Sequence, residues 1–299
     1  PIIRLNSILM YILLKMIALL PLSFLQLIAS FVSIILNSFD SSMKRITSIN
    51  LKLAYPELSV EDHSQLVKKS LKSQCLTYIE FIKCWGMSPE YSLSLLKNIQ
   101  GEHVFTDALA NGKGVIVVVP HFGCWELLNA WLNVHATPVI MYKPNKSEGV
   151  NRYVLEARQK FNATLVPTDE TGIRAIFKSL KQGGLTVILP DHVPKPSGGI
   201  FSNFYGQHAL SSTLVSKLAS KTQCNVIGLS CIRDTKNPQH FSVICRPLSD
   251  DILSKDLQLS VDTLNAEMQE MIDVAPEQYI WSYKRFRNLS NKSNVYKKQ

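Results

Sequence analysis

Residues 114–126 read Gly114-Val115-Ile116-Val117-Val118-Val119-Pro120-His121-Phe122-Gly123-Cys124-Trp125-Glu126. The run of β-branched apolar residues after the glycine predicts a short strand that is buried on both faces. Pro120 ends the strand, and a helical pattern begins at Trp125. A buried strand that leads through a loop into a helix is typical of α/β folds with a largely parallel sheet.

Strand-like runs recur on the C-terminal side of this stretch. We predict further strands at residues 138–142, 185–189, 225–232 and 240–245. Because these runs are separated by helical patterns, we expect a mostly parallel central sheet flanked by helices on both faces. Ligands of such sheets bind beyond the carboxyl ends of the strands, so we expect the site in the loops after Val119 and Leu189.

The N-terminal segment is more apolar than the rest of the chain. No charged residue occurs from Met16 to Phe39, a run of 24 positions. As one helix, this run would be long enough to cross a hydrocarbon core of about 30 Å. A signal peptide and a buried core helix are alternative interpretations. We favour a retained membrane anchor, which spans the bilayer or lies at its interface with a bend at Pro21.

This assignment divides the chain into an anchor at residues 1–40 and a main domain at residues 41–299. The basic residues Lys44, Arg45 and Lys52 follow the apolar run. Positive charge next to a membrane segment is typical of the cytoplasmic side, so we expect the main domain there.

Composition narrows the classes of partner. Lys and Arg outnumber Asp and Glu by 32 to 23, which gives a formal net charge of +9 and indicates an anionic partner. The basic stretch from Lys284 to Lys298 suits lipid headgroups or an acidic protein, and no nucleic-acid-binding motif accompanies it. The 6 cysteines lack CxxC spacing, and no set of ligands has the spacing of a metal site.

His121 and Glu126 are the candidate catalytic pair. A neutral imidazole accepts a proton, and a carboxylate bonded to its other nitrogen fixes the tautomer and stabilises the imidazolium. Five positions separate the two residues, which would let Glu126 reach back from the helix to His121. Such a pair suits the deprotonation of an alcohol that attacks an acyl carbonyl. A purely structural histidine is the alternative.

Two other groups carry alternative chemistry. Cys124 stands at the start of the predicted helix, where a thiolate nucleophile is favoured. Asp191 and His192 follow the strand at residues 185–189 and could form a second acid–base pair. Asp191 equally suits a helix cap or a turn.

The sequence around His121 resembles the lipid A biosynthesis late acyltransferases, within the wider lysophospholipid acyltransferase-like group. The resemblance covers nearly the whole chain. Its other motifs are Asn50-Leu51, Ala54-Tyr55-Pro56, Tyr142-Lys143-Pro144 with Arg158, Pro190-Asp191 with Pro194, Phe204-Tyr205-Gly206 and Pro276-Glu277-Gln278-Tyr279-Ile280-Trp281 with Arg285-Phe286. The chain departs from the family pattern at Cys124, where Asn is frequent, and at His192, where Gln is expected.

The resemblance implies a membrane-bound acyltransferase with its catalytic domain at residues 41–299. It would move a fatty acyl chain from acyl-acyl carrier protein to a hydroxyl of a lipid A precursor, without a metal or other cofactor. Its partners would be the acyl carrier protein, the precursor glycolipid and the phospholipids of the bacterial inner membrane. Nucleic acid is not an expected partner.

The resemblance also implies roles for single residues. His121 would be the general base and Glu126 its orienting partner. Arg158 or backbone N–H groups near Gly123 would form an oxyanion site for the substrate. Asp191 would contact the substrate from the second loop. Arg174 is a weaker candidate for a substrate contact. A different glycolipid or phospholipid acceptor, a lipid hydrolase and a non-catalytic lipid-handling protein are the alternatives.

Overall fold

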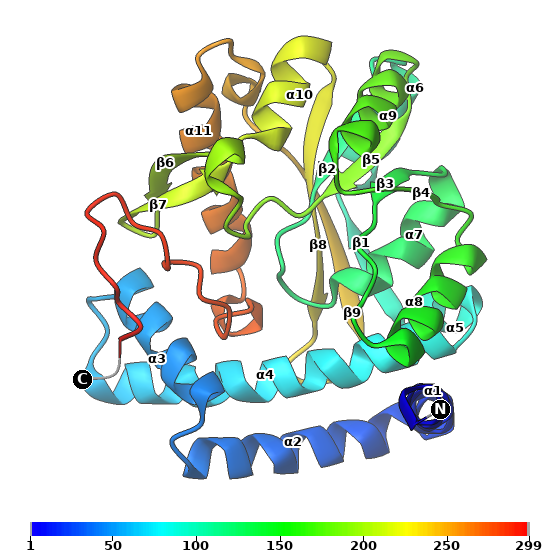
Figure 1. The fold of residues 1–299 in the computed structure, drawn as a ribbon, viewed down its shortest axis with the longest axis vertical. Coiled ribbons are helices and arrows are strands. Elements are labelled where there is room, and N and C mark those ends of the chain that lie inside the picture. Colours follow the sequence, from blue (N-terminus) through cyan, green and yellow to red (C-terminus); the bar gives the residue numbers. More distant parts are fainter. Residues whose placement is uncertain (1, 298–299) are drawn as a thin grey trace.

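A seven-stranded sheet forms the centre of the computed structural model, which describes residues 2–297 and their side chains from residue 5 onward (Figure 1). Lys298 of the basic C-terminal stretch lies outside the described residues. The spatial order is β1 (Leu96–Gln100), β9 (Phe241–Pro247), β8 (Asn225–Arg233), β2 (Val115–Val118), β5 (Leu185–Ile188), β3 (Val139–Met141) and β4 (Thr164–Val166).

The sheet is mostly parallel, as predicted. Strands β8, β2, β5, β3 and β4 run in one direction. Strand β9 is antiparallel to β8, and β1 is parallel to β9, so these two strands run the opposite way. The predicted strand at residues 240–245 therefore exists but is antiparallel, which apolar runs alone do not reveal because they report burial rather than direction.

Helices cover both faces of the sheet, which confirms the predicted layering. The side chains of Ile116 and Val118 on β2 lie in one core cluster, and those of Val115 and Val117 lie in another, because successive side chains of a strand point to opposite faces. The first cluster includes residues of α9 (Glu170–Lys181), α10 (Leu214–Thr222) and α11 (Leu257–Asp273). The second includes residues of α6 (Glu102–Ala110) and α7 (Leu128–His135).

Helix α4 (Val60–Gly86) crosses the carboxyl ends of the parallel strands (Figure 1). Its start is capped by Ser59, whose Oγ accepts the N–H of Asp62 at 3.0 Å. The remaining helices are α3 (Ser42–Ala54), α5 (Pro89–Leu95) and α8 (Glu148–Lys160), with short 3₁₀ turns η1 (Trp125–Leu127), η2 (Pro196–Gly198), η3 (Asp250–Leu253) and η4 (Pro276–Gln278).

A two-stranded hairpin, β6 (Gly199–Phe204) and β7 (Gln207–Ser212), follows the loop after β5. The family motif Phe204-Tyr205-Gly206 forms the end of β6 and the turn of this hairpin. Tyr205 and Gly206 have φ of 50° and 73°, the left-handed values that the favoured two-residue turns require. Tyrosine is an unusual residue for the first of these positions, so composition gives no signal of the turn.

The apolar N-terminal segment forms two helices, α1 (Ile2–Leu19) and α2 (Leu22–Ser38), not the single helix expected from the charge-free run. Within the described residues, no single helix has the length and hydropathy to cross a membrane. The pair from Leu5 to Leu19 and from Leu22 to Ser38 meets both requirements together, but it bends by 114°. The bend falls at Pro21, as predicted, because proline lacks an N–H donor and disfavours a helical conformation in the residue before it.

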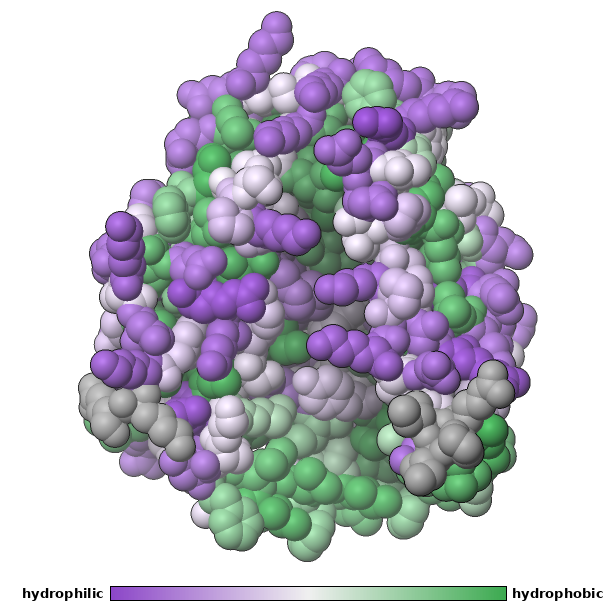
Figure 2. Space-filling model, in the orientation of Figure 1, coloured by the Kyte–Doolittle hydropathy of each residue, from purple (hydrophilic) through white to green (hydrophobic). Residues whose placement is uncertain are grey.

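Helices α1 and α2 pack on α4 and expose their other faces. The ammonium of Lys83 on α4 donates to the carbonyls of Ala18 and Leu20, at 2.7 Å and 2.8 Å, where the end of α1 leaves carbonyls unpaired. Most of the exposed large hydrophobic side chains of the described residues belong to these helices, among them Leu19, Leu27 and Phe31, which are 78%, 68% and 63% exposed. They form the apolar region at the lower end of Figure 2. A single-sided apolar surface of this kind is typical of a contact with a membrane or a partner.

Candidate active site

His121 follows β2, in a loop clamped between the end of β8 and the segment after η4. Gly123 donates its N–H to the carbonyl of Gln278 at 2.9 Å, and the N–H of Cys124 donates to the carbonyl of Cys231 at 2.8 Å. Gly123 has φ of 63°, and a Cβ there would lie 2.1 Å from the carbonyl oxygen of Cys231. This position therefore requires glycine. The loop holds His121 on a rigid support.

Asp191, in the loop three residues after β5, is the residue that holds His121. Its Oδ1 accepts from Nδ1 of His121 at 2.8 Å, and its Oδ2 accepts from the backbone N–H of His121 at 3.1 Å and the hydroxyl of Tyr279 at 2.9 Å. Burial alone would raise the pKa of Asp191, but the charge and hydrogen bonds of His121 hold the pKa of that carboxyl well below its usual range. An ionised carboxylate only accepts hydrogen bonds, so Nδ1 carries a proton, and in the neutral form of the ring Nε2 is the nitrogen with the lone pair.

The ring of His121 is held in a stack of three. It lies face to face with His192, with 3.6 Å between centroids and 2° between planes, and His192 stacks on Tyr283 at 4.0 Å and 15°. Trp125 packs edge-on against His121 at 5.1 Å. Burial, with further contributions from His121 and from two arginines, lowers the pKa of His192 to about 4, so its ring is neutral at pH 7. The stack fixes the plane of the His121 ring.

Glu126 is bonded to Arg158, and this corrects the prediction that it orients His121. The guanidinium of Arg158 on α8 donates to both carboxylate oxygens of Glu126, at 2.7 Å and 2.8 Å. Trp85 Nε1 and Asn129 Nδ2 donate to the same carboxylate, at 2.9 Å and 3.0 Å. Burial would raise the pKa of Glu126, but Arg158 more than offsets this and lowers it. The 3₁₀ turn that carries Glu126 aims its side chain at α8 and α4 rather than at the Nδ1 side of His121.

The predicted oxyanion donors near Gly123 are already in use. The N–H groups of Phe122, Gly123 and Cys124 donate to the carbonyls of Pro120, Gln278 and Cys231, respectively. These N–H groups are occupied because neighbouring backbone carbonyls clamp the loop, a packing that the sequence does not reveal. Arg158 keeps donors beyond its contact with Glu126, because Glu126 accepts from only two of its five N–H groups.

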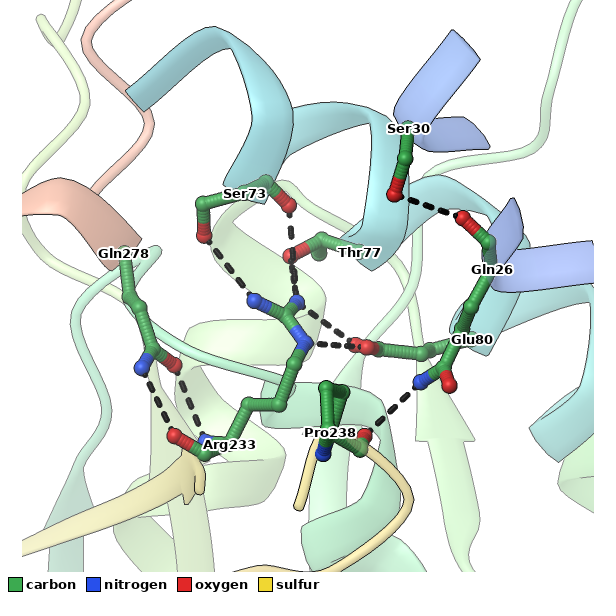
Figure 3. A network of polar contacts seen from close by, with 8 residues as sticks. All are labelled: Gln26, Ser30, Ser73, Thr77, Glu80, Arg233, Pro238 and Gln278. Atoms are coloured by element: carbon green, nitrogen blue, oxygen red, sulfur yellow. Dashed lines mark hydrogen bonds and ion pairs between the residues drawn. The ribbon is translucent and has the colours of Figure 1, made fainter. Parts of the chain in front are cut away.

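A buried polar network lies behind the loop (Figure 3). Gln278, whose carbonyl holds Gly123, exchanges two side-chain hydrogen bonds of 2.9 Å with the backbone of Arg233. The guanidinium of Arg233 in turn binds the carboxylate of Glu80 on α4 and the hydroxyl of Thr77. Each member of the pair is almost fully buried, with side chains 5% and 2% exposed. The network ties the loop to α4.

Cys124 is fully buried against other thiols and Glu80. Burial raises the pKa of Cys124 well above its ordinary value, and the neighbouring Cys84 and Glu80 add to the effect. A thiol in such surroundings stays protonated and is a poor nucleophile, so the geometry does not support an acyl-enzyme at this residue. Among the described residues, no group of three His, Cys, Asp or Glu side chains could hold a metal ion.

Arg174 lies apart from the stack of rings. It is on the exposed face of α9, where it pairs with Glu170 at 3.4 Å, one helical turn before it. Of the predicted site residues, the structure therefore brings together His121 with Asp191 and Glu126 with Arg158. It adds Tyr279 and Tyr283, and it places His192 in the ring stack rather than in a hydrogen-bonded acid–base pair with Asp191. The contact of Tyr279 with Asp191 is not apparent in sequence, because 88 positions separate the two residues.

A family model described as bacterial lipid A biosynthesis acyltransferase matches residues 3–288. This chain belongs to that family. The chain is similar to the lipid A biosynthesis lauroyltransferase of Escherichia coli (strain K12), with 21% identity over 249 residues that make up 83% of this chain and 80% of the relative. Lipid A biosynthesis acyltransferase 2 of Shigella flexneri is 25% identical over 259 residues, 85% and 81% of the two chains.

A third relative is the lipid A biosynthesis myristoyltransferase of Escherichia coli (strain K12), 24% identical over 244 residues, or 81% of this chain and 75% of the relative. As a lipid A biosynthesis acyltransferase family member, the chain is an acyltransferase. The resemblance found in the sequence is confirmed.

Several motifs of this lipid A acyltransferase family member have structural roles. The side-chain amide of Asn50 donates to the carbonyls of Trp281 and Tyr283, both at 2.7 Å, and so places the ring that supports His192. Arg285 is buried and donates to the carbonyl of Leu210 at 2.9 Å. These residues position the C-terminal segment, which supplies Tyr279 and Tyr283 to the site.

Proposed function

We propose that this protein transfers a fatty acyl chain from acyl-acyl carrier protein to a hydroxyl of a lipid A precursor. The observation that carries the proposal is the His121–Asp191 pair at the carboxyl end of β2, with Nε2 of His121 left as a proton acceptor. The curated relatives support the acceptor class, since they are named as lipid A biosynthesis acyltransferases. No cofactor enters the proposal, because a thioester is already activated toward an alcohol.

His121 acts as the general base in this scheme. Its Nε2 takes the proton of the acceptor hydroxyl while the oxygen attacks the thioester carbonyl, and the C–O bond of the new ester forms. The tetrahedral intermediate then expels the thiol as the C–S bond breaks, and the imidazolium returns its proton to the departing sulfur. The carboxylate of Asp191 stabilises the imidazolium between these steps.

Arg158 stabilises the negative charge of the intermediate. Its side chain is 15% exposed, so the guanidinium is largely shielded from water. Its electrostatic interaction with a negatively charged oxygen is therefore stronger than it would be in water. Glu126 holds the guanidinium in place by a two-pronged contact. In this proposal Glu126 is a positioning residue that acts through Arg158.

We propose that the site lies at the cytoplasmic face of the bacterial inner membrane, and the exposed apolar side chains of α1 and α2 support this position. We propose that the bent pair lies in the bilayer interface, with its exposed apolar side chains among the phospholipids. The acceptor lipid then reaches the site from the same membrane.

The test is acyl transfer by the purified full-length protein. Wild type, acyl-acyl carrier protein and a lipid A precursor should give a glycolipid heavier by one acyl chain in mass spectrometry. The His121→Ala variant should lose activity by about 10² to 10⁴. Free fatty acid as the main product would point to a hydrolase, modification of a glycerolipid alone would point to another acceptor, and absence of turnover with retained lipid binding would point to a non-catalytic role. Each of these results would overturn the proposal.

A further inference from the structure

A groove of about 750 Å³ lies between α9 and α10, outside the stack of rings. Its floor is apolar and includes Met141, Phe177 and Leu218. Its walls carry the cations of Arg174, Lys217 and Lys221. This combination suits a ligand with both acidic and apolar side chains, because a purely anionic ligand would leave the floor uncovered.

The cations continue along α9 beyond the groove. On α9, Arg174, Lys178 and Lys181 are spaced by four and three residues, so they share one face of the helix over about 10 Å. The ammonium of Lys181 lies 5.9 Å from the ring of Phe177, at the edge of the floor. All the groove's lysines are exposed. The positive strip is longer than a single phosphate group.

Few acidic side chains oppose this strip. Helix α10 contains no Asp or Glu. On α9 the acidic residue is Glu170, whose contact with Arg174 is exposed to solvent and so is weak. Asp169, which precedes α9, caps the helix: its carboxylate accepts hydrogen bonds from the N–H groups of Thr171 and Gly172. The face therefore keeps a net positive charge.

The groove is connected to the proposed active site by the loop after β5. Pro194 and Gly198 line the groove, and Pro194 is three residues beyond Asp191. Three residues of extended chain span at most about 11 Å, so one wall of the groove lies close to the carboxylate that holds His121. A flexible arm that enters beside Pro194 could therefore present its end to His121.

The groove also lies away from the apolar helices. In Figure 1, α9 and α10 occupy the upper part of the molecule and α1 and α2 its lower edge, where the apolar surface of Figure 2 gathers. A protein in the aqueous phase can reach this face while α1 and α2 rest on a bilayer. The position favours a soluble partner over a membrane surface.

We propose that the α9–α10 groove is the docking surface for the acyl carrier protein, an acidic protein that carries its acyl group on a flexible arm. The inference rests on the proposed function for the identity of the donor. Charge complementarity along both helices steers the carrier to the groove, and its apolar side chains cover the floor. The arm then runs past Pro194 toward His121.

The experiment compares two triple charge reversals in the full-length protein. The groove variant is Arg174→Glu/Lys217→Glu/Lys221→Glu. The control is Lys97→Glu/Lys113→Glu/Lys255→Glu, three exposed lysines on other parts of the surface, which changes the net charge equally. Each protein is assayed with acyl-acyl carrier protein and with a small acyl-pantetheine thioester, and binding of carrier protein without an acyl group is measured by fluorescence polarisation.

The groove variant should lower kcat/KM for the carrier-bound donor about 10- to 100-fold relative to the small thioester, mainly through KM, and should weaken carrier binding by a similar factor. The control should keep the wild-type ratio and affinity. Equal ratios in the two variants would overturn the docking site while leaving the proposed function intact. A groove variant that binds vesicles of anionic phospholipid less well but carrier protein equally well would assign the face to the membrane instead. If wild type turns over no thioester, the proposed function fails, and unchanged carrier binding in the groove variant would then reject the docking site separately.

Discussion

A single carboxylate, Asp191, determines which nitrogen of His121 can take a proton. Sequence spacing favours Glu126 for this task because the two residues are close in the chain. In the structure the parallel pairing of β2 and β5 brings Asp191 to the same sheet edge as His121 instead. The loop between β5 and β6 thus contributes as much to the site as the loop after β2.

His192 makes folding stability depend on pH. Its pKa is about 4 in the folded protein, below its ordinary value near 6.5, because the ring is buried. Between these values the unfolded chain binds a proton that the folded chain does not. The stability contribution is therefore complete above about pH 6.5 and is lost as pH falls to 4, by up to about 3 kcal/mol. Urea unfolding of His192→Gln should show a flatter dependence in this window.

The exposed His103 on α6 provides the control for that measurement. The His103→Gln variant should follow the wild-type dependence of the unfolding free energy on pH. If wild type and His192→Gln lose stability in parallel from pH 6.5 to 4, the buried neutral state of His192 is wrong.

At the scale of elements, the Glu80–Arg233 pair joins α4 to the end of β8 beneath the His121 loop (Figure 3). Removing one partner of a buried pair leaves the other charge without compensation. We expect Glu80→Ala to lower the free energy of unfolding by about 3–5 kcal/mol, and Lys68→Ala on the exposed face of α4 to change it by about 0.5 kcal/mol or less. Urea denaturation followed by circular dichroism measures both. A loss below about 1 kcal/mol in Glu80→Ala would show that the network does not hold the loop.

Elements that depend on residues close together in the chain are predictable from sequence. Elements that depend on pairing between distant segments are not. The buried run of β2 and the break at Pro21 depend on nearby residues, and both are where the sequence places them. The antiparallel direction of β9 and the β6–β7 hairpin depend on long-range pairing. The same limit applies to the site: His121 is recognisable from its motif, whereas Asp191 as its partner requires the sheet order.

At the scale of the whole molecule, the apolar surface of α1 and α2 should determine membrane binding. Leu27 and Ile34 on α2 are 68% and 63% exposed and lie seven residues apart on one helical face. Leu27→Glu/Ile34→Glu should lower partition into phospholipid vesicles by more than about tenfold, because each buried aliphatic side chain contributes about 1.5–3 kcal/mol. Vesicle co-sedimentation measures this partition.

Leu259→Glu/Val274→Glu places the same charges on exposed apolar positions at α11 and should leave vesicle partition at the wild-type value. If both double variants bind vesicles equally, the basic surface rather than α2 carries membrane association.

The central claim is that His121, oriented by Asp191, is the general base of acyl transfer, and the turnover number of Asp191→Asn tests it most directly. Asparagine keeps the shape of aspartate. Its oxygen would accept from the His121 N–H and Tyr279, so its NH₂ would face Nδ1 and force the proton onto Nε2. We predict a loss of kcat of about 10² to 10⁴ in a protein with wild-type circular dichroism and carrier binding. A folded Asp191→Asn variant whose kcat stays within about tenfold of wild type would contradict the account.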